Sequence, residues 1–210
     1  QRLAAGTAGQ VLKTGGSGAN PSWGTVSSDF VKLAGVDYSG STATEVDFTQ
    51  FMDDSVYASY MIRGYFLFGT SSQGIRAQLL NNTTAYTGAS DYYNAGFQSY
   101  RTQSHGIGST IGGNVDANGK NYIQMYGWGA NGSTDSFFTL GVYGKPTTSG
   151  RHTGFTTEGW VKDSSGDAYI FYDAQGGYIN QTGNVDGVKL YSSSGAQLNN
   201  FQATVWGLKK

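Results

Sequence analysis

The sequence predicts an all-β protein, an antiparallel β-sandwich of jelly-roll type. Hydrophobic residues recur with period two in short runs, and no stretch with helical periodicity is free of Gly, Ser and Thr. Turn dipeptides separate these runs at short intervals. The 210 residues include 33 Gly and only 2 Pro, and 14% are aromatic, which supplies both turns and a large apolar core. About ten short strands with frequent turns favour two packed antiparallel sheets.

The clearest strand signal is Val56–Phe68. Successive side chains of a strand point to opposite faces, so alternate residues of this run should form the core. The expected core face comprises Val56, Ala58, Tyr60, Ile62, Gly64, Phe66 and Phe68.

The other expected strands have the same alternating pattern and are bounded by turn residues. They are Phe30–Ala34, Thr44–Phe48, Ile75–Leu80, Tyr122–Tyr126, Phe137–Tyr143, Phe155–Val161, Ala168–Tyr172, Val188–Tyr191 and Phe201–Leu208. The expected turns are Asn118-Gly119, Asn131-Gly132, Ser165-Gly166, Gly176-Gly177, Asp186-Gly187 and Ser194-Gly195.

The N-terminal stretch differs from the rest of the chain. It is rich in Gly, Ala, Thr and Ser and has too few large apolar residues to bury much surface alone. We therefore expect residues 1–25 to be an attachment or trimerisation segment and residues 26–210 to be the sandwich domain. Because Gln1 is not an initiator methionine, we also expect the chain to be part of a longer or processed protein.

Charge and hydropathy exclude several classes of partner. The net charge of −1 gives no basic footprint for nucleic acid. The longest apolar run is Tyr65–Phe68, far short of the roughly 20 residues that cross a bilayer, so no membrane insertion is expected. The absence of Cys excludes disulfides and thiolate chemistry.

No motif indicates catalysis or a resident metal. Gly127–Gly132 fits G-x-G-x-x-G, but a strand follows it instead of the helix that dinucleotide binding needs. His105 and His152 lack partners at zinc-ligand spacing. We expect no catalytic residues, no metal site and no cofactor, and a structural calcium ion at the acidic stretches Asp116–Gly119 or Asp163–Asp167 stays open.

Aromatic residues in polar, Gly-rich surroundings are the candidate ligand contacts. Flat rings beside amides and hydroxyls suit sugar stacking, and they also suit protein interfaces. Burial in the sandwich core is the alternative for each of them. The candidates are Tyr92, Tyr93, Tyr100, Trp128 and Trp160.

The N-terminal segment resembles a short module of bacteriophage tail-fibre and other virion appendage proteins. Arg2–Thr14 contains the run G-T-A-G-Q-V-L, and Asn20–Gly24 contains P-S-W after a Gly/Asn-rich turn. The candidate assembly and virion-attachment residues of this segment are Leu3, Val11, Leu12, Pro21 and Trp23.

Further segments resemble a phage fibre or capsid (head)-fibre domain with a jelly-roll fold. Residues 97–154 depart from that pattern, and ligand-binding loops are where such families vary most. The similar segments are Phe30–Leu33, Val46–Phe48, Tyr57–Arg63, Gly88–Tyr92 and Phe201–Lys210.

The resemblance implies a structural protein of the virion surface, assembled as a homotrimer. Its N-terminal segment would attach to other phage virion proteins, and its sandwich would be displayed outward to bind a host-surface glycan or protein. A head-fibre or capsid decoration protein, and a non-catalytic carbohydrate-binding module, are the alternatives. A tailspike depolymerase is disfavoured because the stacked repeats of a β-helix are missing.

Overall fold

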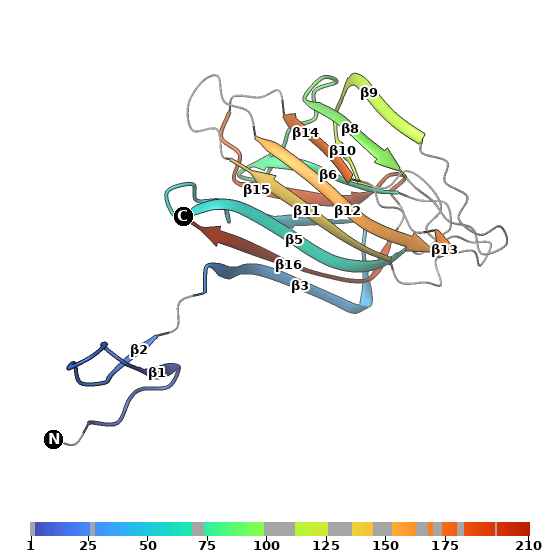
Figure 1. Cartoon of the computed structure of the whole chain (residues 1–210). Helices are drawn as coiled ribbons and strands as arrows, with labels where there is room; N and C mark the ends of the chain where they lie inside the picture. The colour runs from blue at the N-terminus through green and yellow to red at the C-terminus, as the bar shows by residue number, and fades with distance from the viewer. Residues whose placement is uncertain are drawn as a thin grey trace.

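The computed structural model describes residues 3–25, 28–68, 74–98, 112–125, 136–144, 153–162, 168–169, 174–179, 183–195 and 197–210. Within these ranges the chain forms β-strands and no helix, as the periodicity predicts (Figure 1). The strands are β1 (Gln10–Lys13), β2 (Ser22–Thr25), β3 (Phe30–Ala43), β4 (Glu45–Phe48), β5 (Tyr57–Phe68), β6 (Ile75–Asn81), β7 (Thr84–Ala85), β8 (Tyr92–Gln98), β9 (Gly112–Lys120), β10 (Ile123–Gln124), β11 (Ser136–Tyr143), β12 (Gly154–Lys162), β13 (Ala168–Tyr169), β14 (Ala174–Ile179), β15 (Gly187–Ser192) and β16 (Leu198–Lys209).

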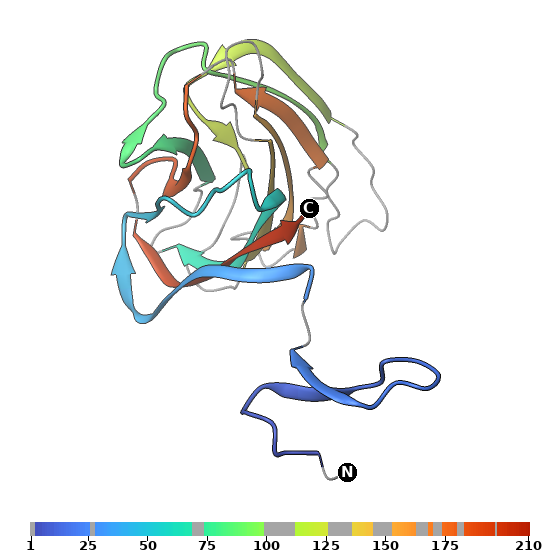
Figure 2. The same cartoon turned by 90° about the vertical axis from the view of Figure 1, so that its left-hand side faces the viewer.

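Two antiparallel sheets form the body of the protein. The larger has the order β3-β16-β5-β11-β12-β14-β8-β9, with β13 beside β12. The smaller has the order β10-β6-β15-β4, with β7 beside β6. The larger sheet curls around the core that it shares with the smaller one, which gives the body a β-sandwich-like form (Figure 2). The all-β, antiparallel class predicted from the sequence is confirmed.

Eight strands pair in a nested pattern. The outermost pair is β3 with β16, followed inward along the chain by β4 with β15, β5 with β11, and β6 with β10. The first and third pairs belong to the larger sheet, and the second and fourth belong to the smaller. The chain therefore alternates between the two sheets as it proceeds inward through these pairs.

The remaining strands of the body arise from two excursions, between β6 and β10 and between β11 and β15. The excursions meet where β8 pairs with β14, and β14 pairs with β12. They therefore extend the larger sheet beyond β11, so that its outer face is wider than the nested strands alone would make it.

Aromatic rings fill the centre of the core. The Phe138 ring lies 6.0 Å from the rings of both Phe66 and Phe201, between centroids. Gly64 on β5 is opposite Phe138 on one side and Ala203 on the other, so a residue without a side chain lies where these rings converge. A Cβ at Gly64 would collide with the Gln202 carbonyl and would lie 2.8 Å from the Ala203 Cβ. These collisions mean that close packing requires glycine at this position. A turn is not the reason, because Gly64 lies inside β5.

The period-two prediction for Val56–Phe68 is correct in the middle of the strand and wrong at its start. Tyr60, Ile62 and Phe66 are buried, as expected. Val56 and Ala58 are exposed: Val56 precedes β5, which begins at Tyr57, and Ala58 lies at the start of that strand. Val56 instead belongs to a turn in which its amide donates to the Asp53 carbonyl.

Three predicted turns are wrong, because their glycines belong to strands. Asn118-Gly119 lies within β9 and Gly176-Gly177 within β14, while Gly187 begins β15. A Cβ at Gly177 would collide with the Tyr93 carbonyl and would lie 2.6 Å from the Phe155 ring. Glycine there permits close approach of a neighbouring strand. The turn at Ser194-Gly195 is confirmed, with a φ of 74° at Gly195.

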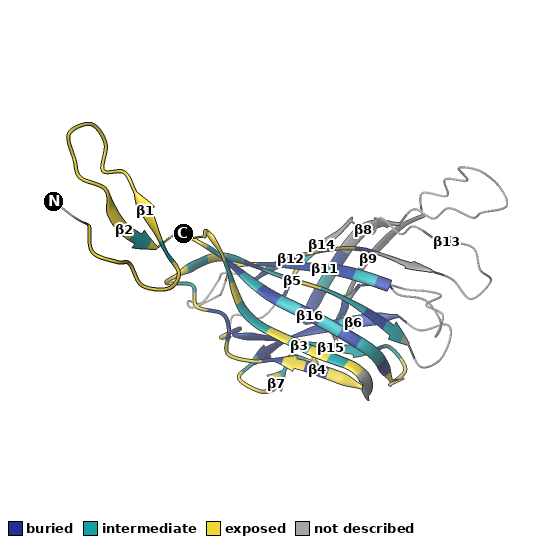
Figure 3. Cartoon of the chain, turned by 90° about the horizontal axis from the view of Figure 1, so that it is seen from below, coloured by how far each residue is buried: buried dark blue, intermediate teal, exposed yellow. Residues whose placement is uncertain are grey.

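Residues 3–25 contain a hairpin that is separate from the two sheets. β1 and β2 pair with each other, and Figures 1 and 3 show the hairpin extending away from the sandwich. No residue of the hairpin is buried.

Removing the central ring of the core should destabilise the fold. We expect Phe138→Ala to lower the free energy of unfolding by about 3–5 kcal/mol, because it leaves a cavity between Phe66 and Phe201. Chemical denaturation measures this change. The matched control is Thr139→Ala, at a half-buried neighbour on the opposite face of β11, which should change stability by less than about 0.5 kcal/mol. Equal effects of the two substitutions would contradict the assignment of these faces.

Candidate functional site on the outer face of the larger sheet

Tyr92, a candidate ligand contact, lies in the core. Its side chain is completely buried, and its hydroxyl accepts a hydrogen bond from the Leu79 amide (2.8 Å) and donates one to the Tyr86 carbonyl (3.0 Å). Desolvation raises the pKa of Tyr92 far above its usual value. The expectation that Tyr92 contacts a ligand is therefore wrong, because the ring connects β8 to the smaller sheet.

Tyr93, the next residue, lies on the opposite face of β8 and is half-buried. It is directly paired with Tyr178 of β14, and the two rings stack with centroids 5.1 Å apart and an interplanar angle of 16°. Tyr178 is 40% exposed. The stacked pair forms an aromatic surface that includes one predicted residue and one that the sequence did not indicate.

The structure describes the side chain of none of the other three candidate contacts. Tyr100 and Trp128 lie outside the described residues. Trp160 lies on β12, where its backbone is paired with Phe137, and its side chain is outside the described part of the chain.

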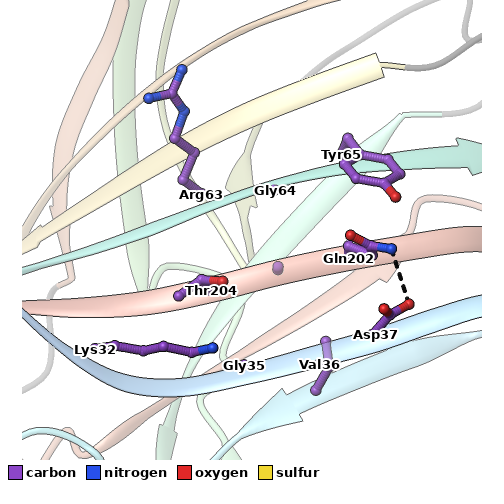
Figure 4. Close-up of a pocket in the computed structure, with 10 residues that line it drawn as sticks. Lys32, Gly35, Val36, Asp37, Arg63, Gly64, Tyr65, Gln202 and Thr204 are labelled. Carbon is purple, nitrogen blue, oxygen red and sulfur yellow. Dashed lines mark hydrogen bonds between the residues drawn. The ribbon is translucent and has the colours of Figure 1, made fainter.

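The outer face of the larger sheet is hollowed over β3, β16 and β5. We call this the polar hollow; it has a volume of about 400 Å³, and its side chains include Lys32, Asp37, Arg63, Tyr65, Gln202 and Thr204 (Figure 4). The Lys32 chain extends over Gly35, its Cε lying 3.3 Å from where a Cβ of Gly35 would be. The hollow thus presents two cationic side chains, phenol and hydroxyl groups, and a carboxylate.

The carboxylate of the polar hollow is held by hydrogen bonds. Asp37 accepts from the Ser39 amide (2.9 Å) and from the Gln202 side-chain amide (3.0 Å). The bonds from Ser39 are the main cause that lowers the pKa of Asp37. Asp37 is therefore ionised at neutral pH and faces β16 in a fixed orientation (Figure 4).

A second hollow, of about 570 Å³, lies on the same face over β5, β11 and β12. We call it the aromatic hollow; Phe30 and Tyr143 line it together with Ser59, Met61, Thr139, Gly141, Thr156 and Glu158. Phe30 is 46% exposed and Tyr143 is 49% exposed. Exposed rings around a concave surface, with hydroxyls and one carboxylate beside them, are typical of a non-covalent binding site.

The two hollows are lined by residues that are neighbours in the register of the strands. Arg63 of the polar hollow is paired with Thr139, which is in turn paired with Glu158. This face therefore combines aromatic rings with charges of both signs. Sequence reasoning missed Phe30, Arg63, Tyr143 and Glu158 as site residues, because each occurs as one residue of an ordinary alternating strand.

The candidate assembly residues lie on the N-terminal hairpin, and all are exposed. Leu12 is opposite Trp23 in the register, so their side chains share one face. The Trp23 indole N–H donates to the Ala4 carbonyl at 2.6 Å, and its ring packs against Gly6, where a Cβ would lie 2.6 Å from it. Leu3 and Val11 are exposed apolar residues, and Pro21 immediately precedes β2.

The described residues include neither a metal-binding cluster nor a membrane-spanning helix. The described ranges contain no group of three or more Asp, Glu, His or Cys residues placed to hold a metal ion. No helix that is long and apolar enough to span a bilayer occurs in them.

The structural role of Tyr92 can be tested by removing its hydroxyl. We expect Tyr92→Phe to lower the free energy of unfolding by about 1–3 kcal/mol, because the buried Leu79 amide loses its acceptor. Thermal or chemical denaturation measures the loss. Tyr93→Phe, on the half-exposed face, is the control and should change stability by less than about 0.5 kcal/mol. An unaffected Tyr92→Phe protein would contradict the role given to this hydrogen bond.

Comparisons with known proteins identify no family for this chain. The chain matches no protein-family model. It also matches no curated protein sequence. The two exposed features described above, the N-terminal hairpin and the outer face of the larger sheet, are the candidate functional surfaces of the described chain.

Proposed function

We propose that this chain is a structural protein of a bacteriophage virion, a trimeric fibre whose sandwich is displayed outward and binds the host cell surface, in the first place a glycan. The N-terminal hairpin would attach it to other virion proteins. The resemblance of Arg2–Thr14 and Asn20–Gly24 to virion appendage proteins first indicates this function. The geometry of the hairpin and of the sheets supports it physically.

The observation on which the proposal depends is the exposure of the hairpin. Leu12 is 53% exposed, and Leu3, Val11 and Trp23 are exposed with it. A two-stranded hairpin is only marginally stable by itself in water. A hairpin that exposes these apolar side chains and extends away from the sandwich is therefore suited to pack against other chains.

A trimer would satisfy this requirement with one repeated contact. In cyclic threefold symmetry, a patch on one chain meets a different patch on the next, and the contact closes after three copies. Three sandwiches on one stem would also bind a surface together, so that weak individual sites suffice for adsorption.

We also propose that the eight nested strands form a jelly roll. In chain order, β3, β4, β5, β6, β10, β11, β15 and β16 are strands one to eight. The observed pairs are then one with eight, two with seven, three with six and four with five. This is the order expected when a folded-over ribbon of strands is wound into two sheets, an architecture used by viral capsid and lectin domains.

Two alternatives share these features. A head-fibre or capsid decoration protein would use the same hairpin, and labelling the protein and imaging its place on the particle separates it from a tail fibre. A free carbohydrate-binding module is favoured by the aromatic hollow, but it would not need the exposed hairpin.

The assembly role predicts that the 210-residue chain is trimeric in solution, with a mass of three times 22.3 kDa. We expect Leu12→Asp to shift the protein toward the monomer mass, because a charge would be buried in the contact. Sedimentation or native mass spectrometry measures the change. Ser17→Asp, which adds the same charge at the exposed turn of the hairpin, should leave the trimer intact.

A monomeric wild-type protein would overturn the trimer. A Leu12→Asp protein that remains trimeric would overturn the role of the hairpin.

A further inference from the structure

We propose that the aromatic hollow is a binding site for a neutral pyranose sugar, with the Tyr143 ring as the stacking platform and Phe30 as the opposite wall. This inference deepens the proposed function, because it assigns glycan binding to a defined surface. None of its residues was indicated by the sequence as a ligand contact.

Tyr143 is held in the orientation that a platform needs. Its hydroxyl is hydrogen-bonded to the Thr156 hydroxyl at 3.2 Å. A Cβ at Gly141 would lie 2.7 Å from both of these oxygens, so the Tyr143 side chain folds back along β11 over Gly141 toward β12. The missing side chain at Gly141 therefore makes room for the tyrosine. With half of its surface exposed, the Tyr143 side chain is fixed before any ligand arrives, which limits the entropy lost on binding.

Phe30 forms the opposite wall of the hollow. The register of β3, β16, β5 and β11 places it in the same row of residues as Tyr143. On the outer face, Phe30 is paired with Leu208, Leu208 with Ser59, and Ser59 with Tyr143. The two exposed rings thus lie on either side of Ser59. The volume of about 570 Å³ is within the range of small-ligand sites.

The polar groups of the hollow favour a sugar over an apolar ligand. Ser59, Thr139 and Thr156 contribute hydroxyls, and Glu158 contributes an exposed carboxylate. Sugar hydroxyls can donate to that carboxylate and exchange hydrogen bonds with the serine and threonine groups. Glu158 is the one charged side chain among the described residues that line the aromatic hollow, whereas Arg63, across Thr139 from it, lines the polar hollow. An anionic sugar in the aromatic hollow would therefore meet a carboxylate, so the site should select a neutral sugar.

The test is saturation-transfer NMR on the 210-residue chain with a panel of neutral probes. The panel comprises the methyl glycosides of glucose, galactose, mannose, N-acetylglucosamine and N-acetylgalactosamine. We expect transfer to the C–H face of at least one glycoside. Tyr143→Ala should weaken that binding about tenfold or more, because the stacking surface is lost.

Two further variants define the mechanism. Tyr143→Phe keeps the ring but loses the Thr156 hydrogen bond, and it should weaken binding only a few-fold. Tyr191→Ala is the control: it removes a half-buried tyrosine on the outer side of β15 in the smaller sheet, away from the hollow, and should leave binding unchanged. Circular dichroism verifies that each variant is folded.

Failure of this inference can be distinguished from failure of the proposed function. Absence of transfer to every glycoside, or binding that Tyr143→Ala leaves unchanged, would overturn the sugar site. A Tyr143→Ala protein of lower oligomeric mass, without sugar binding by the wild type, would identify the hollow as a contact between copies of the chain and would also overturn it. A monomer that binds sugar through Tyr143 would preserve the site and overturn the trimeric fibre.

Discussion

The C-terminal strand β16 lies between β3 and β5, and the arrangement of the larger sheet depends on this double pairing. Phe201 is paired with Tyr38 on one side, while Ala203 is paired with Gly64 on the other. The chain must close a loop of well over a hundred residues before these bonds form, so the pairing is stabilised by the core that it completes. An irregularity at Asn200, which has a φ of 46°, shifts the register and lets one strand match both neighbours.

The two faces of the larger sheet have separate roles because strand residues alternate between them. On β11, Phe138 and Leu140 are buried against the smaller sheet, while Thr139 and Tyr143 face outward. The rigid core therefore fixes the spacing of the outward residues across β5, β11 and β12. A binding surface of this kind needs no long loop, since its walls are side chains of packed strands.

The hairpin and the sandwich differ in how they are stabilised. The sandwich buries large aromatic and aliphatic side chains between its sheets, whereas the hairpin has short pairing and the local contacts of Trp23 with Ala4 and Gly6. Apolar side chains such as Leu12 remain in water. In the proposed assembly, burial of these side chains by other chains would stabilise the hairpin, and the folding of this segment would be coupled to assembly.

The sequence by itself determined the all-β class, the approximate positions of most of the eight nested strands, and the apolar face of β5. These properties depend on local alternation, which a short window contains. It did not determine β8, β9 or β14, because their glycines, such as Gly177, have the same local signature as turns. It also could not separate buried Tyr92 from half-exposed Tyr93, or indicate that Phe30 and Tyr143 face one hollow. Only the tertiary structure decided these points, because they depend on which distant strands become neighbours and on the register in which they pair.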